Sequence, residues 1–309
     1  MSVLSSVLSP VLQPVLGSVF DASSGGPPRF RGLDLDFAQG RYAINGPYRP
    51  GLPAGWSFSR AGAGTSERSN GVIVPFASDF PRITDRGLLL EAQRTNKVLC
   101  YSANPTSMLG IGGAGASRLS LVNDSAALAE GGLGTINPNG VVYKLDNSDN
   151  PARAEIGISG ASGNLSPHSC SIYMRGSGLA VFRAYSSGTP FPSPTPLSNG
   201  YIRRQYLYTP AANASILALL AEPGATVYFI LPQLEEGTFL TSPIVTEGAA
   251  ATRGTDSASI TVPSGVSSFT AYYGSGQATS GVVTPGQTFD ISASNRPWFN
   301  NYLQRLVMQ

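Results

Sequence analysis

The most acidic stretch of the sequence, residues 144–155, has side chains suited to two kinds of chemistry. It contains Asp146, Asp149 and Glu155. Two facing carboxylates can hydrolyse a glycosidic bond, and Asp and Asn oxygens at alternating positions suit a hard cation such as calcium. A turn built from Asp, Asn and Pro accounts for the same composition without either activity. We favour the turn, so the sequence predicts no catalytic residue, no metal and no cofactor, and hence a protein that is not an enzyme.

Other catalytic patterns are missing from the sequence. The single histidine, His168, lies in a Ser-Pro-His-Ser segment without an identifiable catalytic partner, and we expect it in a surface loop. One histidine and two cysteines cannot form a zinc cluster. The glycine-rich residues 110–115 lack the Lys-Ser/Thr and the following helix of a phosphate-binding loop.

Aromatic residues on the expected strands favour sugar binding. Rings stack on the apolar faces of sugars, while flanking Asn, Asp and Arg side chains bind the hydroxyls. Tyr206 and Tyr208 share strand parity, as do Tyr201, Arg203 and Gln205, so each set should line one face. The candidate carbohydrate-binding residues are Tyr143, Tyr173, Tyr185, Tyr206 and Tyr208, with Phe191 on a proline-rich loop that suits a recognition tip or a subunit contact.

The composition favours β-sheets joined by turns. The 309 residues include 36 Gly and 24 Pro, but only 12% are charged, about half the usual share. Only two lysines are present, Lys97 and Lys144, whereas a helical enzyme normally covers its surface with Glu and Lys. The net charge of +2 and the lack of a dense Arg cluster predict binding to neither nucleic acid nor a membrane.

The two cysteines, Cys100 and Cys170, are interpreted as buried thiols, although the sequence leaves a disulfide open. Apolar runs stay shorter than the ~18 residues that span a bilayer. The N-terminus lacks the basic region of a signal peptide.

An internal repeat occupies residues 1–20, where apolar pairs recur every four positions. This spacing keeps the pairs near one face of a helix, although Pro10 and Pro14 would interrupt a regular one. The segment is expected to dock on a capsid or spike-base protein rather than on its own domain, because it carries more apolar surface than a free tail exposes. The anchor residues are Val3, Leu4, Val7, Leu8, Val11, Leu12, Val15 and Leu16.

Short alternating runs separated by turn signals predict strands throughout the rest of the chain. Strands at close, regular spacing without long helices indicate a two-sheet sandwich or jelly roll. The central runs are residues 141–145, 154–158, 169–174, 180–185, 201–208, 215–220 and 225–231. Shorter runs before and after them are residues 33–37, 72–74, 87–90, 259–262, 268–273, 281–283 and 288–292, and residues 296–308 suit a terminal strand or a short helix.

Two phrases carry a family resemblance. Residues 80–96 resemble the G-L-L-I-E-x-x-R-T-N-L signature that precedes a jelly-roll module in many phage tail, fibre and head-spike proteins. Residues 231–253 resemble the Q-L-E-x-G-x-x-x-T-S-x-I-P-T…T-R phrase that closes the same module. The resemblance covers about residues 30–255 and implies a jelly roll similar to carbohydrate-binding modules and concanavalin-like lectins. The chain departs from the pattern at residues 101–106, where the usual S-x-x-F is missing.

Both phrases also have a plain structural interpretation. Gly87 and Gly237 should adopt backbone conformations closed to other residues. Arg94 is expected to form ion pairs that tie the ends of the jelly roll together. Its candidate partners are Glu91, Glu235 and Glu236. We therefore interpret both phrases as scaffold and not as a binding site.

The sequence predicts an all-β protein with four consecutive parts. These are an N-terminal anchor and linker (residues 1–28), a small β-rich shaft or leader (29–98), a carbohydrate-binding-like jelly roll (99–252) and a small C-terminal β unit (253–309). The resemblance implies a spike or fibre on the surface of a virion or of a phage-derived gene transfer agent, assembled in the host cytoplasm. It would attach to a host capsular or surface polysaccharide.

Two other functions stay open: a glycan depolymerase, which needs a carboxylate pair in the sugar groove, and a decorative assembly protein without a ligand. A spike is expected to be a homo-oligomer, since weak sugar sites gain avidity when several are presented together. A pentamer is favoured over a trimer.

Overall fold

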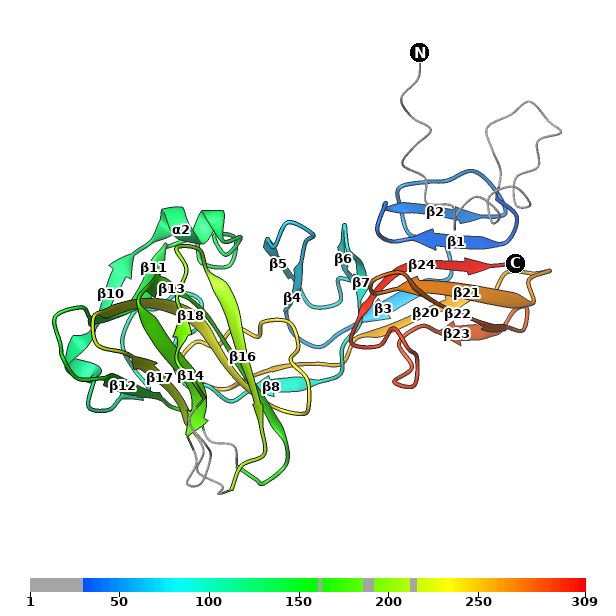
Figure 1. Ribbon diagram of the computed structural model, residues 1–309. Coiled ribbons are helices and arrows are strands. Elements are labelled where there is room, and N and C mark those ends of the chain that lie inside the picture. The colour runs from blue at the N-terminus through cyan, green and yellow to red at the C-terminus, as the bar shows by residue number, and fades with distance from the viewer. Residues whose placement is uncertain (1–29, 161–162, 186–191, 212–215) are drawn as a thin grey trace, which may run out of the picture. The chain divides into compact units, whose positions relative to one another are not determined.

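The computed structural model describes residues 30–160, 163–185, 192–211 and 216–309, and their regular secondary structure is almost entirely β-strand (Figure 1). The predicted all-β class is confirmed. The described helices are the short η2 (Ala116–Arg118) and α2 (Ser125–Glu130). The predicted anchor, Phe191 and the side chain of Tyr185 lie outside the described residues.

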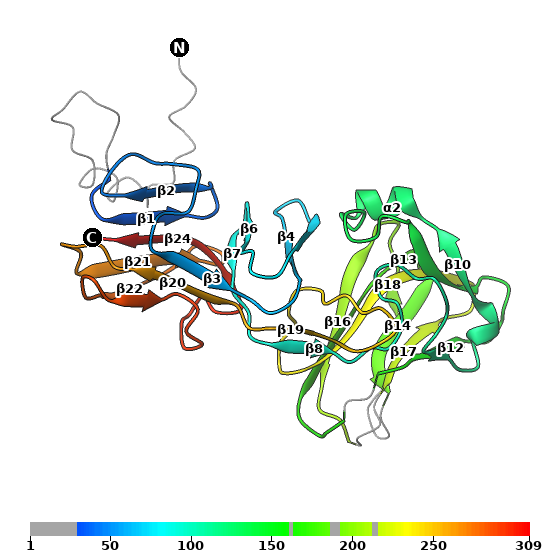
Figure 2. The same cartoon turned by 180° about the vertical axis from the view of Figure 1, so that it is seen from behind.

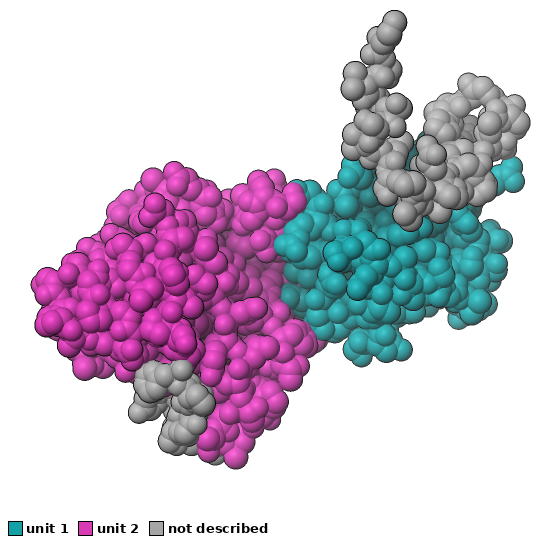
Figure 3. Space-filling view, in the orientation of Figure 1, with its two compact units in different colours: residues 1–59, 83–91, 256–309 teal, residues 60–82, 92–255 magenta. Residues whose placement is uncertain are grey.

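The chain divides into two compact units, each built from segments far apart in the sequence (Figure 3). Unit 1 contains residues 1–59, 83–91 and 256–309, and unit 2 contains residues 60–82 and 92–255.

Unit 2 is a sandwich of two antiparallel sheets. The first consists, in spatial order, of β10 (Leu119–Asn123), β11 (Val141–Asn147), β18 (Ala225–Glu236), β13 (His168–Ser177) and β16 (Ile202–Tyr208). The second consists of β15 (Thr195–Pro196), β14 (Leu179–Tyr185), β17 (Ile216–Ala221), β12 (Ala154–Ile158) and β9 (Ile111–Gly112). Successive strands from β11 to β14 alternate between the two sheets, and so do β16, β17 and β18. Such alternation is typical of a jelly roll.

The core of the sandwich follows from the period-two alternation of its strands. On β12, Ala154, Ile156 and Ile158 are buried between the sheets, while the residues between them face outward. On β18, Val227 and Phe229 are fully buried in the same core. Each strand therefore has one apolar face, and the two apolar faces meet.

A β-bulge changes this alternation halfway along β18. The register between β13 and β18 shifts between Ser171 and Tyr173, and Leu231 adopts a left-handed conformation with φ +53°. The Leu231 N–H donates to Ser102 O at 2.6 Å. Because the bulge adds one residue, Leu234 returns to the core although its parity differs from that of Phe229.

The two phrases of the sequence meet in unit 2. The short strand β8 (Arg94–Asn96) pairs with β19 (Ala251–Arg253). Asn96 is fully buried, and its Nδ2 donates to Pro232 O (3.2 Å) and Ile244 O (2.9 Å). Its Oδ1 accepts from Leu234 N (3.0 Å) and Val98 N (3.1 Å). One amide therefore joins the opening phrase to both halves of the closing phrase, which supports their interpretation as scaffold.

The contacts of Arg94, Glu235 and Glu236 differ from the ion pairs predicted between Arg94 and these acids. Arg94 donates to Gln93 O and lies 4.7 Å from the ring centre of Phe239. Buried Glu235 accepts from the Thr241 hydroxyl (2.6 Å), and Glu236 lies 3.8 Å from Lys97. Gly87 and Gly237 have the expected positive φ, +116° and +140°.

Part of the outer face of the first sheet is covered by a second core. The hairpin of β4 (Gly64–Glu67) and β5 (Ile73–Phe76) contributes Ile73, and α2 contributes Leu128. They pack with Val142, Tyr173 and Ile230 of the sheet. Val122 of β10 and Tyr228 of β18 are half-buried and pack against this core.

Unit 1 joins the two ends of the described chain. Its larger sheet has β2 (Arg41–Ile44), β1 (Leu33–Asp36), β24 (Tyr302–Met308), β21 (Ser268–Tyr273) and β22 (Gln277–Val282) in this order, and β7 (Gly87–Leu89), which pairs with β6 (Arg82–Thr84), joins β24. The strands β1, β24 and β21 lie side by side in both views (Figure 1 and Figure 2). A smaller sheet has β23 (Thr288–Asp290), β20 (Ser257–Thr261) and β3 (Trp56–Ser59).

The larger sheet of unit 1 crosses the domain boundaries predicted from the sequence. The sequence-based division placed β1 in residues 29–98 and β24 in a separate C-terminal unit, but Leu35 and Leu306 are paired in the same ladder. Residues 302–308 form a strand, one of the two predicted forms. Local patterns identify the strands, whereas pairing across more than 250 residues leaves no local signal.

The Asn96 amide provides a test of how the sandwich is closed. Asn96→Ala should lower the free energy of unfolding by about 3 kcal/mol or more, because it leaves buried backbone groups of the closing phrase and of Val98 without hydrogen-bond partners. Thr95→Ala is the matched control, since the exposed Thr95–Thr252 hydroxyl contact should contribute less than about 1 kcal/mol. Urea denaturation of both variants measures the difference, and equal losses would contradict the proposed closure.

Stability should fall at high pH. Cys100 and Cys170 are buried and not joined in a disulfide, and burial raises the pKa of Cys100 to about 12 and also that of Cys170. Burial likewise raises the pKa of Tyr143 and Tyr201. The folded state holds these protons more tightly, so their contribution is complete below the unfolded values, 9.0 for the thiols and 10.0 for the phenols, and is lost above them. The urea midpoint should therefore be lower at pH 11 than at pH 8; an unchanged midpoint would contradict this.

Candidate functional site

A row of polar and aromatic side chains crosses the outer face of the first sheet of unit 2. The register pairs Ser120 of β10 with Lys144 of β11, Lys144 with Tyr228 of β18, and Tyr228 with Arg175 of β13. Paired residues of neighbouring strands lie on the same face, and the neighbours of Tyr228, Val227 and Phe229, face the core. We call these four residues the Tyr228 row.

Arg175 is held in place by a carboxylate. Its Nε donates to Asp124 Oδ2 at 2.7 Å, and its Nη2 donates to Asp124 Oδ1. The Tyr201 hydroxyl donates to the same carboxylate at 2.7 Å. The guanidinium carbon lies 4.1 Å from the ring centre of Tyr228. The paired Asp124 raises the pKa of Arg175, and burial together with the hydrogen bond to Asp124 raises the pKa of Tyr201, so both keep their protons.

The other end of the row is also ionic. Lys144 Nζ lies 2.7 Å from Asp146 Oδ2 and 5.9 Å from the Tyr228 ring centre. Asp146 Oδ1 accepts from the Ser148 hydroxyl at 2.7 Å and from Thr226 at 3.2 Å. Lys144 and then Ser148 hold the pKa of Asp146 well below its usual range. Tyr228 thus lies between two cations, each paired with an acid.

A shallow groove of about 530 Å³ adjoins this row, and we call it the serine-rich groove. It shares Ser120 with the row and contains the Asp146 carboxylate, and Arg118 and Asp149 form an ion pair in its lining. Hydroxyls, carboxylates and a guanidinium group are the partners that sugar hydroxyls bind. The lining residues are Ser117, Arg118, Leu119, Ser120, Asp146, Ser148 and Asp149.

Two of the predicted sugar-binding tyrosines lie in apolar cores. Tyr143 is fully buried, stacks on Phe229 with ring centres 5.0 Å apart, and has its hydroxyl 3.0 Å from Tyr101 O. Tyr173 is 8% exposed and packs in the second core, 5.7 Å from the Arg203 guanidinium. The predicted role of Tyr143 is wrong because a sugar could reach its ring only if the sandwich opened.

The predicted parity of Tyr206 and Tyr208 is confirmed, but their shared face is the inner one. The two rings stack 6.1 Å apart, and Tyr208, 8% exposed, belongs to the sandwich core, with half-buried Tyr206 packed against it. We therefore remove Tyr208 from the candidate set. Alternation shows that two residues share a face but not whether that face points inward.

Tyr228 and Arg175 are not among the site residues predicted from the sequence. Both are in or next to runs expected to be strands, and Tyr228 alternates with two apolar residues that face the core. That alternation was the available signal for an outward ring. The row itself depends on pairing between four strands and has no signal within any one of them.

The carboxylates of residues 144–155 do not gather at one site. Asp146 and Asp149 line the serine-rich groove, whereas Glu155 lies on the second sheet in another groove. His168 is not in a surface loop: it is the first residue of β13, fully buried, with Nδ1 2.7 Å from Ser166 O and Nε2 3.2 Å from Lys97 Nζ. The strand begins one residue earlier than the apolar alternation indicated.

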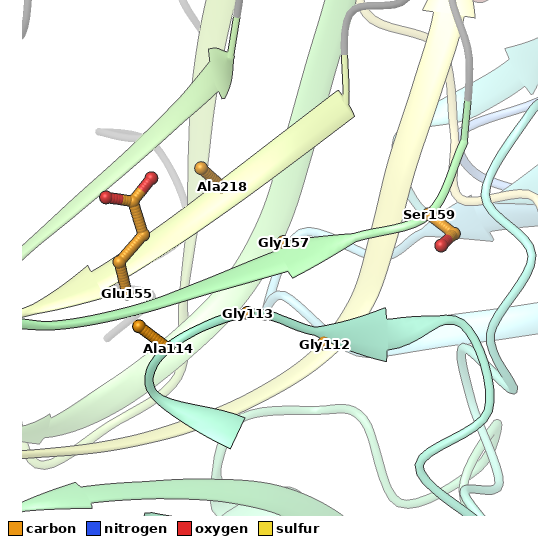
Figure 4. A pocket seen from close by; sticks show the side chains of 7 residues that line it. All are labelled: Gly112, Gly113, Ala114, Glu155, Gly157, Ser159 and Ala218. Carbon is orange, nitrogen blue, oxygen red and sulfur yellow. The ribbon is translucent and has the colours of Figure 1, made fainter. Parts of the chain in front are cut away.

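The groove around Glu155, of about 470 Å³, has almost no side chains on its floor, where Gly157 and Ala218 lie (Figure 4). Glu155 stands at one end, and its carboxylate is 3.6 Å from the buried guanidinium of Arg183. Gly112, Gly113, Ala114 and Ser159 complete the lining. Among the described side chains no aromatic ring lines this groove, and we favour the Tyr228 row with the serine-rich groove as the candidate site.

Within the described ranges, no group of three or more His, Cys, Asp or Glu residues is placed to hold a metal ion. No helix among these residues is long and apolar enough to cross a membrane. No protein-family model matches the chain, and no curated protein matches its sequence.

The ion pair between Lys144 and Asp146 can be tested through the pKa of Asp146. Lys144→Met removes the main cause of the lowered pKa, so the pKa of Asp146 should move up towards its ordinary value of 3.8. Ser148 still donates, so the recovery should be partial. Carboxyl-carbon NMR titration of Asp146 measures the change, and Arg153→Met, which removes the partner of Glu222, is the control. An equal pKa in the wild type and the Lys144 variant would contradict the pairing.

Proposed function

We propose that this protein is a surface spike or fibre subunit of a virus-like particle, and that its unit 2 sandwich binds a cell-surface polysaccharide. The observation that carries the binding proposal is the position of Tyr228, on the outer face of the sheet, between paired cations and beside the serine-rich groove. A sugar ring stacked on Tyr228 could extend its hydroxyls towards Lys144, Asp146 and Ser120.

The surroundings of Tyr228 suit a polar ligand. Arg175 and Lys144 keep donors next to the ring, and their partners Asp124 and Asp146 fix them in position. Side chains already held by ion pairs lose little conformational freedom when a ligand binds, which favours affinity. Neutral ligands suit this surface because each cation is matched by an acid.

Binding without cleavage fits the acids of the groove. A glycosidase needs one carboxyl with a raised pKa to act as general acid. Lys144 lowers the pKa of Asp146, and Arg118 lowers the pKa of Asp149. Both acids are therefore ionised near neutral pH, a state suited to accepting hydrogen bonds from sugar hydroxyls.

The particle part of the proposal depends on the resemblance of residues 80–96 and 231–253 to phage fibre and head-spike proteins. In unit 2 the residues of the two phrases contact each other through Asn96, as expected for phrases that open and close one module. The predicted anchor in residues 1–20 would attach the spike to its base.

Binding can be measured with the purified full chain on an array of bacterial capsular and surface polysaccharides. For a polysaccharide that binds, Tyr228→Ala should weaken the affinity about five-fold, since ring stacking contributes about 1 kcal/mol. Tyr228→Phe should bind like the wild type, because it keeps the ring. Tyr272→Ala, which removes a half-buried tyrosine of unit 1, is the matched control.

Three outcomes would contradict the proposal in different ways. Failure of the wild type to bind any polysaccharide would remove the lectin function. Unchanged affinity of Tyr228→Ala would move the site elsewhere. New reducing ends after incubation with a bound polysaccharide would make the protein a depolymerase.

A further inference from the structure

In the part of the chain that the structure describes, no strand pairs with the outer edge of β22, the last strand of the larger sheet of unit 1. Its sequence, Gln-Ala-Thr-Ser-Gly-Val, contains no charge and no proline, the residues that usually prevent edges from pairing. Val282 at its end is 87% exposed. An open uncharged edge is a template for another strand.

The register shows which backbone groups of β22 are available. Ser268 and Gln309 exchange two hydrogen bonds (2.9 and 3.0 Å), so Ser268 directs its backbone groups away from β22. Phe269 and Ala271, with the opposite parity, direct theirs towards their partners Gly281 and Thr279 on β22. By alternation, Ala278, Ser280 and Val282 direct their N–H and C=O groups to the open edge.

The opposite edge of the same sheet is closed by the chain itself. Tyr42 of β2 and Arg49 exchange two backbone hydrogen bonds, at 2.9 and 2.8 Å. This bridge occupies the outward groups of Tyr42 in the middle of β2, so a ring in which β22 pairs with β2 of the next copy would have to displace Arg49. The partner that matches β22 best is therefore another β22.

We propose that two copies of this protein associate by antiparallel pairing of β22 with β22 across a two-fold axis through Ser280. This register sets Ser280 opposite Ser280 and Ala278 opposite Val282 of the other copy. All three outward residues then form hydrogen-bonded pairs, and no like charges meet. Each exposed Val282 side chain packs against a small Ala278.

The pairing joins two unit 1 sheets into one continuous sheet and is isologous, so it favours an even-numbered assembly over the pentamer or trimer expected for a spike. The contact is small for a specific interface, so association of the free protein should be weak. It does not depend on the proposed polysaccharide binding.

Charge variants at the axis test both the pairing and its register. Ser280→Lys and Ser280→Asp each set like charges opposite each other, and each should weaken dimerisation of the full chain about five-fold. An equimolar mixture of the two variants should recover association as a mixed dimer. Sedimentation equilibrium over a concentration series, with native mass spectrometry of the mixture, measures these species.

Ser280→Pro is the second variant. It removes the central outward N–H while leaving the β21 ladder intact, because Ser280 does not direct its N–H to β21. It should keep the wild-type thermal midpoint to within a few degrees and lose the dimer, and Ser280→Thr should retain it. A monomeric wild type, a dimer that survives Ser280→Pro, or a mixture no more associated than its components would overturn the proposal.

Discussion

The Leu231 N–H donates to Ser102 O inside the β-bulge of β18. The extra residue of this bulge decides which side chains of β18 face the core of the sandwich. Before the bulge Val227 and Phe229 point inward; after it Leu234 does. Without the extra residue Leu234 would turn outward, and the buried polar residues beside it would enter an apolar core. The sandwich therefore depends on a non-glycine residue held at positive φ.

The same strand connects the scaffold to the candidate site. Beyond the bulge, Asn96 and Thr241 satisfy the buried polar groups of the closing phrase. Before it, the regular alternation turns Tyr228 outward between Lys144 and Arg175. The part that closes the sandwich and the part that suits a ligand are therefore separate halves of one twelve-residue strand. This separation explains why residues 231–236 contribute to closure and not to the candidate site.

Residue patterns predicted most of what is local. The runs at 154–158 and 225–231 are strands with the expected alternation, and Gly237 has the expected positive φ. Which face of β16 points inward was not predictable, because it depends on the second sheet, and so Tyr208 was assigned to sugar instead of the core. Pairing of Leu35 with Leu306 was also out of reach, since nothing near either residue specifies so distant a partner.

The proposed function requires polysaccharide to bind the outer face of the first sheet of unit 2. Amide and side-chain NMR shifts of the full chain, titrated with oligosaccharides from a polysaccharide that it retains, test this most directly. The claim predicts saturable shifts at Ser120, Lys144 and Tyr228, with none at Glu155 on the second sheet. Shifts confined to the Glu155 groove or to unit 1 would contradict it.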